Sequence, residues 1–227
     1  MSSLQTVSDP RLSGRTTAQA PAGNAVLRNT YRLLSMTLAF SAVTALGAAA
    51  LNLPHPCLLL TLAGYFGLLF LTSYTRNSAW GLVSVFALTG FMGYMLGPIL
   101  NAYLAMSGGS SIVATAMGTT AVAFLGLSAY ARTAPVGSLP KFGTFLFVGI
   151  LTAFVLGLAA VFLNMPMLSL AVSGLFVLLM SGLIVYETQN IISGGETNYI
   201  MATVTLFVAI YNLFTSLLHL IGFMSDE

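Results

Sequence analysis

The stretch "FGTFLFVGILTAFVLGLAAVFLNMPMLSLAVSGLFVLLMSGLIVYETQNII" (residues 142–192) contains one charged side chain, Glu187, and one short break, "NMP" at 164–166. The hydrocarbon core of a bilayer is about 30 Å thick, and a helix needs roughly 20 apolar residues to cross it. Only helices and closed barrels satisfy all of their backbone hydrogen bonds there. The stretch is long enough for two crossings, and the break between them predicts a helical hairpin in a membrane.

The rest of the chain repeats this pattern. Of its 227 residues, 57% are hydrophobic and 5% are charged, whereas about a quarter of the residues of a soluble domain are charged. Short connectors containing Gly, Pro or Asn separate seven apolar segments: Thr30–Leu51, Cys57–Tyr74, Trp80–Met106, Ser111–Tyr130, Phe142–Leu163, Met167–Ile192 and Ile200–Phe223. We therefore predict an all-α integral membrane protein with a seven-helix transmembrane domain over residues 28–227. Residues 1–27, rich in Ser, Thr and Ala, are expected to form a disordered cytoplasmic tail.

The positive charges indicate an orientation. If the N-terminus is cytoplasmic, every Lys and Arg falls on the cytoplasmic side: Arg11, Arg15, Arg28, Arg32, Arg76, Arg132 and Lys141. This sorting follows the positive-inside rule and places the C-terminus on the opposite side. A net charge of +2 gives no reason to expect nucleic acid as a partner. The single cysteine, Cys57, leaves no intramolecular disulfide and no thiol cluster, so we expect neither a metal site nor a cofactor.

Glu187 is the acidic residue that needs an explanation. It lies about one helical turn before the predicted cytoplasmic end of its segment. An ionised acid deep in hydrocarbon is costly unless it finds a partner or reaches water. Two interpretations remain open: a carboxylate bathed in headgroup water, or a titratable latch that pairs with Arg76 or Arg132.

The last apolar segment carries polar side chains at helical spacing. They are Thr205, Asn212, Ser216 and His219. These positions share one helical face, which in lipid turns toward other helices or a wet cavity. Ordinary hydrogen bonding between helices is one interpretation. The other makes Asn212 and Ser216, together with Glu187, candidate pH-sensing and ion-path residues.

Ser173 and His219 are both expected near the outer face, at similar depth. A serine hydrolase needs a nucleophile and a base in one place. The frame expected around a nucleophilic serine is incomplete, however, because position 171 is Ala. An intramembrane serine hydrolase is therefore a weak alternative, and metal-dependent hydrolysis is weaker still, because the sequence has no HExxH motif and no acidic pair within the apolar segments.

The motif "YMLGPILN" (94–101) interrupts the third apolar segment. Pro98 removes a backbone donor and clashes with the preceding turn, which predicts a kink or an unwound turn at Gly97 and Pro98. Freed carbonyls could line an ion path, or the kink could only shape packing. Gly90 and Gly93, which precede it on a similar face, favour close approach of another helix.

Four stretches together resemble the Bax-inhibitor-motif family of multi-pass membrane proteins. They are "FALTGFMGYMLGPIL" (86–100), "TAMGTTAVAFLGLSAYART" (115–133), "IVYETQNII" (184–192) and "GGETNYI" (194–200), and the likeness runs from about residue 25 to the end. The resemblance implies a bacterial inner-membrane protein without catalytic activity. It also implies a modulator, and slowly processed substrate, of the membrane-anchored AAA+ protease FtsH. The implied partners are this protease, its associated membrane subunits and the lipid bilayer, and the predicted tail would be the end that the protease grips.

The same family includes pH-sensitive calcium leak channels, which is the alternative function. In those members an acid on the sixth helix pairs with an aspartate on the seventh. Glu187 matches the first position, whereas the second falls on Ala209 in "LFVAIYNLF" (206–214). A leak of calcium or another cation would therefore have to operate with Glu187 alone, without the second acid of that pair.

Overall fold

A computed structural model describes residues 10–133 and 139–225, with side chains over 24–133 and 141–225. The described residues form seven helices: α1 (Pro10–Ala50), α2 (Leu58–Thr75), α3 (Trp80–Leu104), α4 (Gly109–Thr133), α5 (Leu139–Phe162), α6 (Pro166–Ile192) and α7 (Tyr199–Ser225). Each is long and apolar enough to cross a membrane. Every predicted segment coincides with one helix, so the prediction of an all-α protein with seven transmembrane helices is confirmed.

The predicted tail is only partly within the described residues. Residues 1–9 lie outside them, whereas α1 begins at Pro10, inside the segment predicted to be disordered. The part of α1 that qualifies as a membrane span starts at Asn24. The division into a tail over 1–27 and a transmembrane domain over 28–227 stays a prediction, as does the compartment that each end faces.

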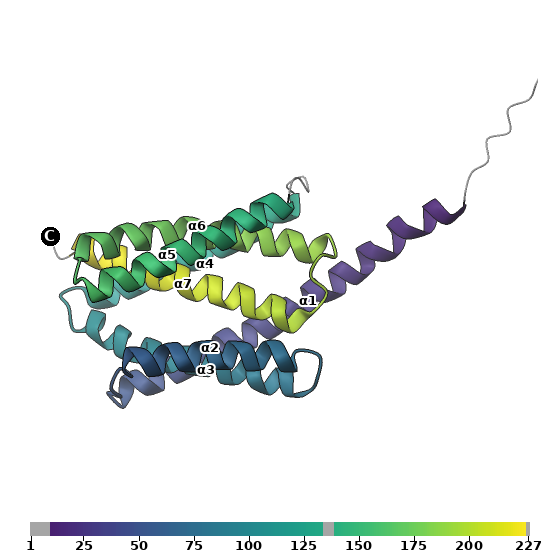
Figure 1. Ribbon diagram of the computed structural model, residues 1–227. Helices are drawn as coiled ribbons and strands as arrows, with labels where there is room; N and C mark the ends of the chain where they lie inside the picture. The colour runs from purple at the N-terminus through teal and green to yellow at the C-terminus, as the bar shows by residue number, and fades with distance from the viewer. Residues whose placement is uncertain (1–9, 134–138, 226–227) are drawn as a thin grey trace, which may run out of the picture.

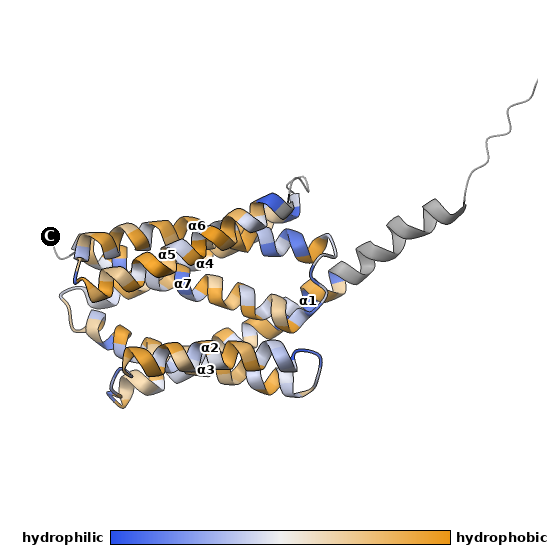
Figure 2. Cartoon of the chain, in the orientation of Figure 1, coloured by the Kyte–Doolittle hydropathy of each residue, from blue (hydrophilic) through white to orange (hydrophobic). Residues whose placement is uncertain are grey.

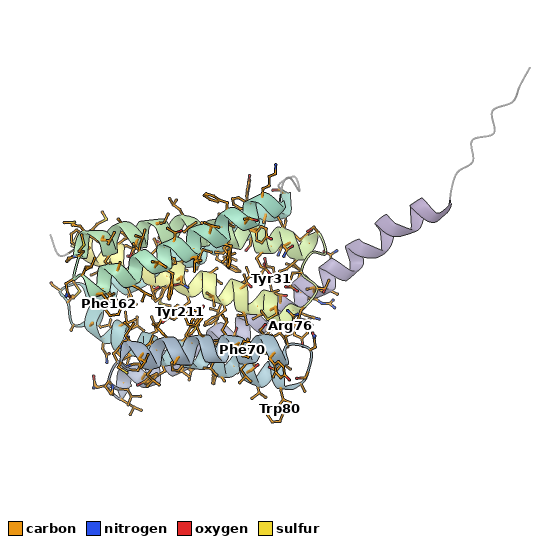
Figure 3. All side chains as sticks on the ribbon, viewed as in Figure 1. Tyr31, Phe70, Arg76, Trp80, Phe162 and Tyr211 are labelled. Carbon is orange, nitrogen blue, oxygen red and sulfur yellow. The ribbon has the colours of Figure 1, made fainter. Side chains whose placement is uncertain are left out.

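α7 is the central helix of the bundle. It packs against α1, α3, α4 and α6, whereas the main neighbour of α2 is α3 and that of α5 is α6. Figure 1 shows α7 between a layer that contains α2 and α3 and a layer that contains α5 and α6. Hydrophobic residues predominate along the helices in Figure 2. Many large apolar side chains are exposed, among them Phe70, Trp80 and Phe162, which Figure 3 labels. An apolar exterior of this kind suits lipid as the solvent.

α1 and α3 form the most extensive helix pair. Their close approach depends on glycines of α3, because a Cβ at Gly93 would overlap the Ser41 carbonyl oxygen and the Thr44 hydroxyl of α1. A Cβ at Gly97 would lie 2.5 Å from the Ala48 Cβ, and one at Gly90 would lie 2.6 Å from the Phe40 ring. The close helix approach expected from these glycines is therefore present.

Of the two alternatives expected at Gly97 and Pro98, the unwound turn is not found, whereas the kink stays a prediction. α3 runs without interruption from Trp80 to Leu104. Contacts with α1 hold it on both sides of the proline: Gly97 lies against Ala48, and Asn101 Nδ2 donates to the Ala49 carbonyl oxygen at 2.8 Å. The proline removes one backbone donor, and these tertiary contacts keep the rest of the turn helical.

Candidate functional site

Glu187 lies at one end of the bundle, where α6 finishes. Figure 1 shows that the α2–α3 loop and the α6–α7 loop share this end, opposite the C-terminus. Its side chain is 5% exposed, and its neighbours Thr188 and Ile191 are fully buried. Ile191 belongs to a core cluster that also contains Leu27 of α1 and Ile200 of α7. The last turns of α6 are thus enclosed by protein, and the interpretation of Glu187 as a carboxylate bathed in water does not describe this structure.

The groups facing the Glu187 carboxyl come from α6 and the loop that follows. The Asn190 side chain is the polar group beside it, and Glu196 is the neighbouring charge. Within the described residues, neither predicted partner forms an ion pair with Glu187. Arg132 lies instead over the Tyr31 ring, with its guanidinium carbon 5.5 Å from the ring centroid. The structure therefore does not bring Glu187 together with Arg132 or Arg76.

Ala209 takes no part in a polar latch. It is fully buried in a cluster with Met180, Ile184 and Leu213. Ile184 is one turn from Glu187 on the same helix, so α7 meets this face of α6 through apolar side chains. In the family that the sequence resembles, some members carry an aspartate at this position. In this chain the position is Ala209, which makes apolar contacts.

Asn198 forms a clamp between the two loops at this end. Its Oδ1 accepts hydrogen bonds from the backbone N–H groups of Ile200 at 3.0 Å and Met201 at 3.1 Å, which caps the start of α7. Its Nδ2 donates to the Arg76 carbonyl oxygen at 3.1 Å and to Asn77 Oδ1 at 2.9 Å in the α2–α3 loop. One side chain thereby fixes the α6–α7 loop, the first turn of α7 and the α2–α3 loop relative to one another.

Asn190 connects Glu187 to this clamp. Its backbone carbonyl accepts hydrogen bonds from Gly195 at 2.9 Å and Glu196 at 3.2 Å, and the Glu196 carboxylate in turn accepts the Asn198 N–H at 2.6 Å. A Cβ at Gly195 would overlap the Asn190 side-chain oxygen, so a larger residue there would displace the Asn190 side chain. A continuous set of contacts runs from Glu187 through Asn190 and the loop to Asn198.

This clamp was not predicted from the sequence. An Asn immediately before an apolar helical run is a recognised N-cap signal, and it could have identified one half of Asn198's role. The other half, the contact with Arg76 and Asn77, joins residues more than a hundred positions apart and has no local signal.

Asn212 and Ser216 lie farther than Glu187 from the end of the bundle that carries the α6–α7 loop. The packing of Ile184 beside Ala209 sets the register of the antiparallel helices α6 and α7. From a rise of 1.5 Å per residue, Asn212 is about 9 Å and Ser216 about 15 Å farther along the axis than Glu187. Asn212 Nδ2 donates to the carbonyl oxygen of Val208 on its own helix at 2.8 Å. Glu187, Asn212 and Ser216 therefore do not lie close together. Their role in an ion path stays a prediction.

Ser173 and His219 do meet, at the opposite end of the bundle. Ser173 Oγ lies 2.8 Å from His219 Nδ1 and 3.0 Å from the Ser169 carbonyl oxygen. A hydroxyl has one proton to donate. If Ser173 donates it to Ser169, His219 must donate to Ser173 and cannot act as its base. No third group orients His219 within the described residues. The arrangement links α6 to α7 without forming a complete catalytic triad.

Comparisons with known proteins give a consistent result. A family model described as "Inhibitor of apoptosis-promoting Bax1" matches residues 23–226. The chain is 52% identical over 202 residues to the "Modulator of FtsH protease YccA" of Escherichia coli K12, covering 89% of this chain and 91% of that protein. It is 50% identical over 204 residues to an uncharacterized protein of Pseudomonas aeruginosa, covering 89% and 90%. An uncharacterized protein of Neisseria meningitidis serogroup A is 35% identical over 219 residues, covering 93% and 96%.

Proposed function

Because the chain belongs to the Bax inhibitor family, whose model matches residues 23–226, we propose that it modulates a membrane-anchored AAA+ protease of the FtsH type, by which it is itself slowly processed. The observation that carries this proposal is the 52% identity, over 89% of the chain, to an E. coli protein named as a modulator of that protease. The chain is a multi-pass protein of the bacterial inner membrane, like the relative named "Inner membrane protein YccA". In this role it acts by association and catalyses no reaction.

The packing of α1 supports a mechanism based on slow extraction. A protease that grips the N-terminal end pulls α1 out of the bundle first. α1 contacts α3, α6 and α7, and its Thr30 carbonyl oxygen accepts a hydrogen bond from Thr203 Oγ1 of α7 at 3.3 Å. Removing α1 therefore breaks the close α1–α3 packing and uncovers the central helix in the same step. A substrate that resists this step occupies the protease and limits its action on other substrates.

The test compares the full chain with a chain that lacks the predicted tail but keeps the helical bundle. Deleting residues 2–20 removes most of the predicted tail and leaves the span from Asn24 intact. In cells with an FtsH-type protease, we expect the truncated chain to be degraded more slowly than the full chain. We also expect a second membrane substrate to lose the protection that the full chain gives it. A Gly/Ser segment of equal length in place of residues 2–20 is the matched control and should restore both effects.

Unchanged turnover of the truncated chain, with unchanged protection of the second substrate, would refute the proposed grip on the tail. Crosslinking in native membranes tests the association itself. We expect the protease, with its associated membrane subunits, among the crosslinked products of the full chain. Their absence would refute the proposed partner.

The second candidate function is a pH-sensitive leak of calcium or another cation. The burial of Glu187 favours it, because a carboxyl enclosed by protein next to a second acid, Glu196, is an arrangement in which protonation can change local contacts. Its connection through Asn190 to the loop clamp would pass such a change to α7 and to the α2–α3 loop. Calcium flux in liposomes that stays at background at every pH would eliminate this candidate.

A further inference from the structure

An apolar groove of about 500 Å³ separates α1 from α4. α1 lines it from Leu38 to Leu46, α4 lines it from Met117 to Leu125, and α7 forms its floor with Phe207 and Tyr211. Figure 3 shows Tyr211 on α7, between the two layers of the bundle. Almost every lining group is apolar, and α1 and α4 are not among the helix pairs in extensive contact. The groove is therefore a place where two transmembrane helices lie side by side without filling the space between them.

A second hollow, of about 440 Å³, lies on the same two helices nearer the arginine-bearing end. Its lining includes Arg28 and Arg32 of α1 and Arg132 of α4. None of these three arginines forms an ion pair within the described part of the chain. Positive charge contributed by two converging helices, with no carboxylate paired to it among the residues that the structure describes, is suited to an anionic group.

Tyr31 joins the two hollows. Its ring lies under the Arg132 guanidinium and makes an edge contact with Phe124, which lines the apolar groove. Among the described residues, its buried hydroxyl has no hydrogen-bond partner, and neither does the buried hydroxyl of Ser128, one turn from Phe124 on α4. A buried hydroxyl without a partner costs free energy, and both hydroxyls lie on the stretch that links the arginines to the groove.

The two hollows lie one after the other along the same face of α1. Arg28, Arg32, Ser35, Leu38 and Ala42 follow one another at intervals of three or four residues, and so share one face of α1. The apolar section from Leu38 to Leu46 is about 12 Å long at 1.5 Å per residue. One leaflet of a bilayer contributes about 15 Å, half of the hydrocarbon core. With Arg32 at headgroup level, Leu38 lies about 9 Å and Leu46 about 21 Å farther along α1, so the groove begins in the leaflet that the arginines face and extends past the midplane of the bilayer.

We propose that an anionic phospholipid binds here, with its phosphate between Arg28, Arg32 and Arg132 and one acyl chain in the groove between α1 and α4. Guanidinium groups match phosphate oxygens in bidentate geometry. An apolar transmembrane helix of a partner fits less well, because it would leave Arg28, Arg32 and Arg132 without an anionic group beside them. This inference does not depend on the proposed relation to a protease.

Retention of lipid by the purified full chain tests the proposal. The chain in a neutral detergent is incubated with dioleoyl phosphatidylglycerol, dioleoyl phosphatidylcholine, short-chain dihexanoyl phosphatidylglycerol or inorganic phosphate. Bound lipid is counted by native mass spectrometry, and thermal unfolding is followed in parallel. We expect one retained dioleoyl phosphatidylglycerol and a raised midpoint of unfolding. We expect weaker retention of the other two lipids, because each lacks the net charge or the long chain, and no effect of inorganic phosphate.

Two variants test the arginine part and the apolar part of the site separately. Replacing Arg28, Arg32 and Arg132 together by Gln should weaken retention of phosphatidylglycerol about tenfold or more, since each basic residue near a membrane surface adds to the attraction. Arg76→Gln, at the same end but outside both hollows, is the matched control and should retain the lipid. Ala121→Leu, which fills the apolar groove, should lower retention of the long-chain lipid to that of the short-chain lipid.

Thermal unfolding without lipid shows that each variant is folded before its retention is compared. Equal retention of phosphatidylglycerol and phosphatidylcholine would overturn the proposal. So would an equal loss of retention in Arg76→Gln and the triple variant, since it would indicate general attraction to positive charge. Loss of a crosslinked partner helix in Ala121→Leu, with lipid retention unchanged, would assign the groove to a protein and refute the proposed lipid.

Discussion

Gly93→Ala tests whether the packing of α1 against α3 controls how fast the chain is extracted. The new Cβ would lie 2.9 Å from the Ser41 Cα and would overlap the Ser41 carbonyl oxygen. Carbon atoms pack best at about 3.5 to 4.0 Å, and the backbone of a helix cannot yield as the end of a long side chain can. The two helices must therefore move apart, at a cost typical of overpacked cores, about 1 to 3 kcal/mol.

Gly47→Ala is the matched control. Gly47 is on α1 itself, and a Cβ there would meet nothing within 4 Å. Both substitutions gain the same helix propensity, up to about 1 kcal/mol. The difference between the two variants thus isolates the steric cost at Gly93. If α1 leaves the bundle first, that cost lowers the barrier to extraction, and degradation should accelerate by about 5- to 150-fold relative to Gly47→Ala.

Pulse-chase measurement of the chain in membranes with an FtsH-type protease gives the degradation rate, and thermal unfolding in detergent gives the stability. We expect Gly93→Ala to be lower in unfolding midpoint and faster in degradation than Gly47→Ala. Equal midpoints would refute the packing argument. A lower midpoint with equal degradation rates would show that α1 is not the helix whose removal limits extraction.

Three further predictions concern the loop clamp, the buried acid and the orientation. Asn198→Ala should lower the unfolding midpoint more than Asn77→Ala, because it loses the α7 cap, typically about 1 kcal/mol, as well as the contact between loops; equal effects would contradict the dual role. In liposomes, Glu187→Gln should abolish any proton-dependent calcium flux of the unmodified chain, and flux that persists with the same pH dependence would remove Glu187 from that function. In a Cys57→Ser background, Asn77→Cys and Met224→Cys should react with a membrane-impermeant maleimide from opposite sides. Labelling of both from one side would overturn the predicted topology.

The fold was accessible from the sequence because the bilayer imposes a length on every helix. The 142–192 stretch has room for two crossings and a break, and the structure forms α5 and α6 there. Pro98 shows where local reasoning about an unwound turn fails. The expected break depends on what a proline does to an isolated helix, whereas the contacts of Gly97 and Asn101 with α1 keep α3 continuous.

The candidate site was less accessible because its partners are set by tertiary contacts. The distance of Glu187 from the end of its helix follows from sequence position, but its burial and its contact with Asn190 do not. Charge complementarity suggested Arg132 as its partner, yet that guanidinium lies over Tyr31. Ser173 and His219 were expected at one depth, and only the structure shows that they touch and lack an orienting third group within the described residues.

The central position of α7 has a consequence for biosynthesis. The helix that touches α1, α3, α4 and α6 is the last of the seven to leave the ribosome. Until it is inserted, the earlier helices lack their common neighbour, and the faces that it will cover remain open to lipid. A nascent chain therefore stays incomplete up to its final segment, and premature termination before Tyr199 would leave an unfinished assembly of helices without a centre.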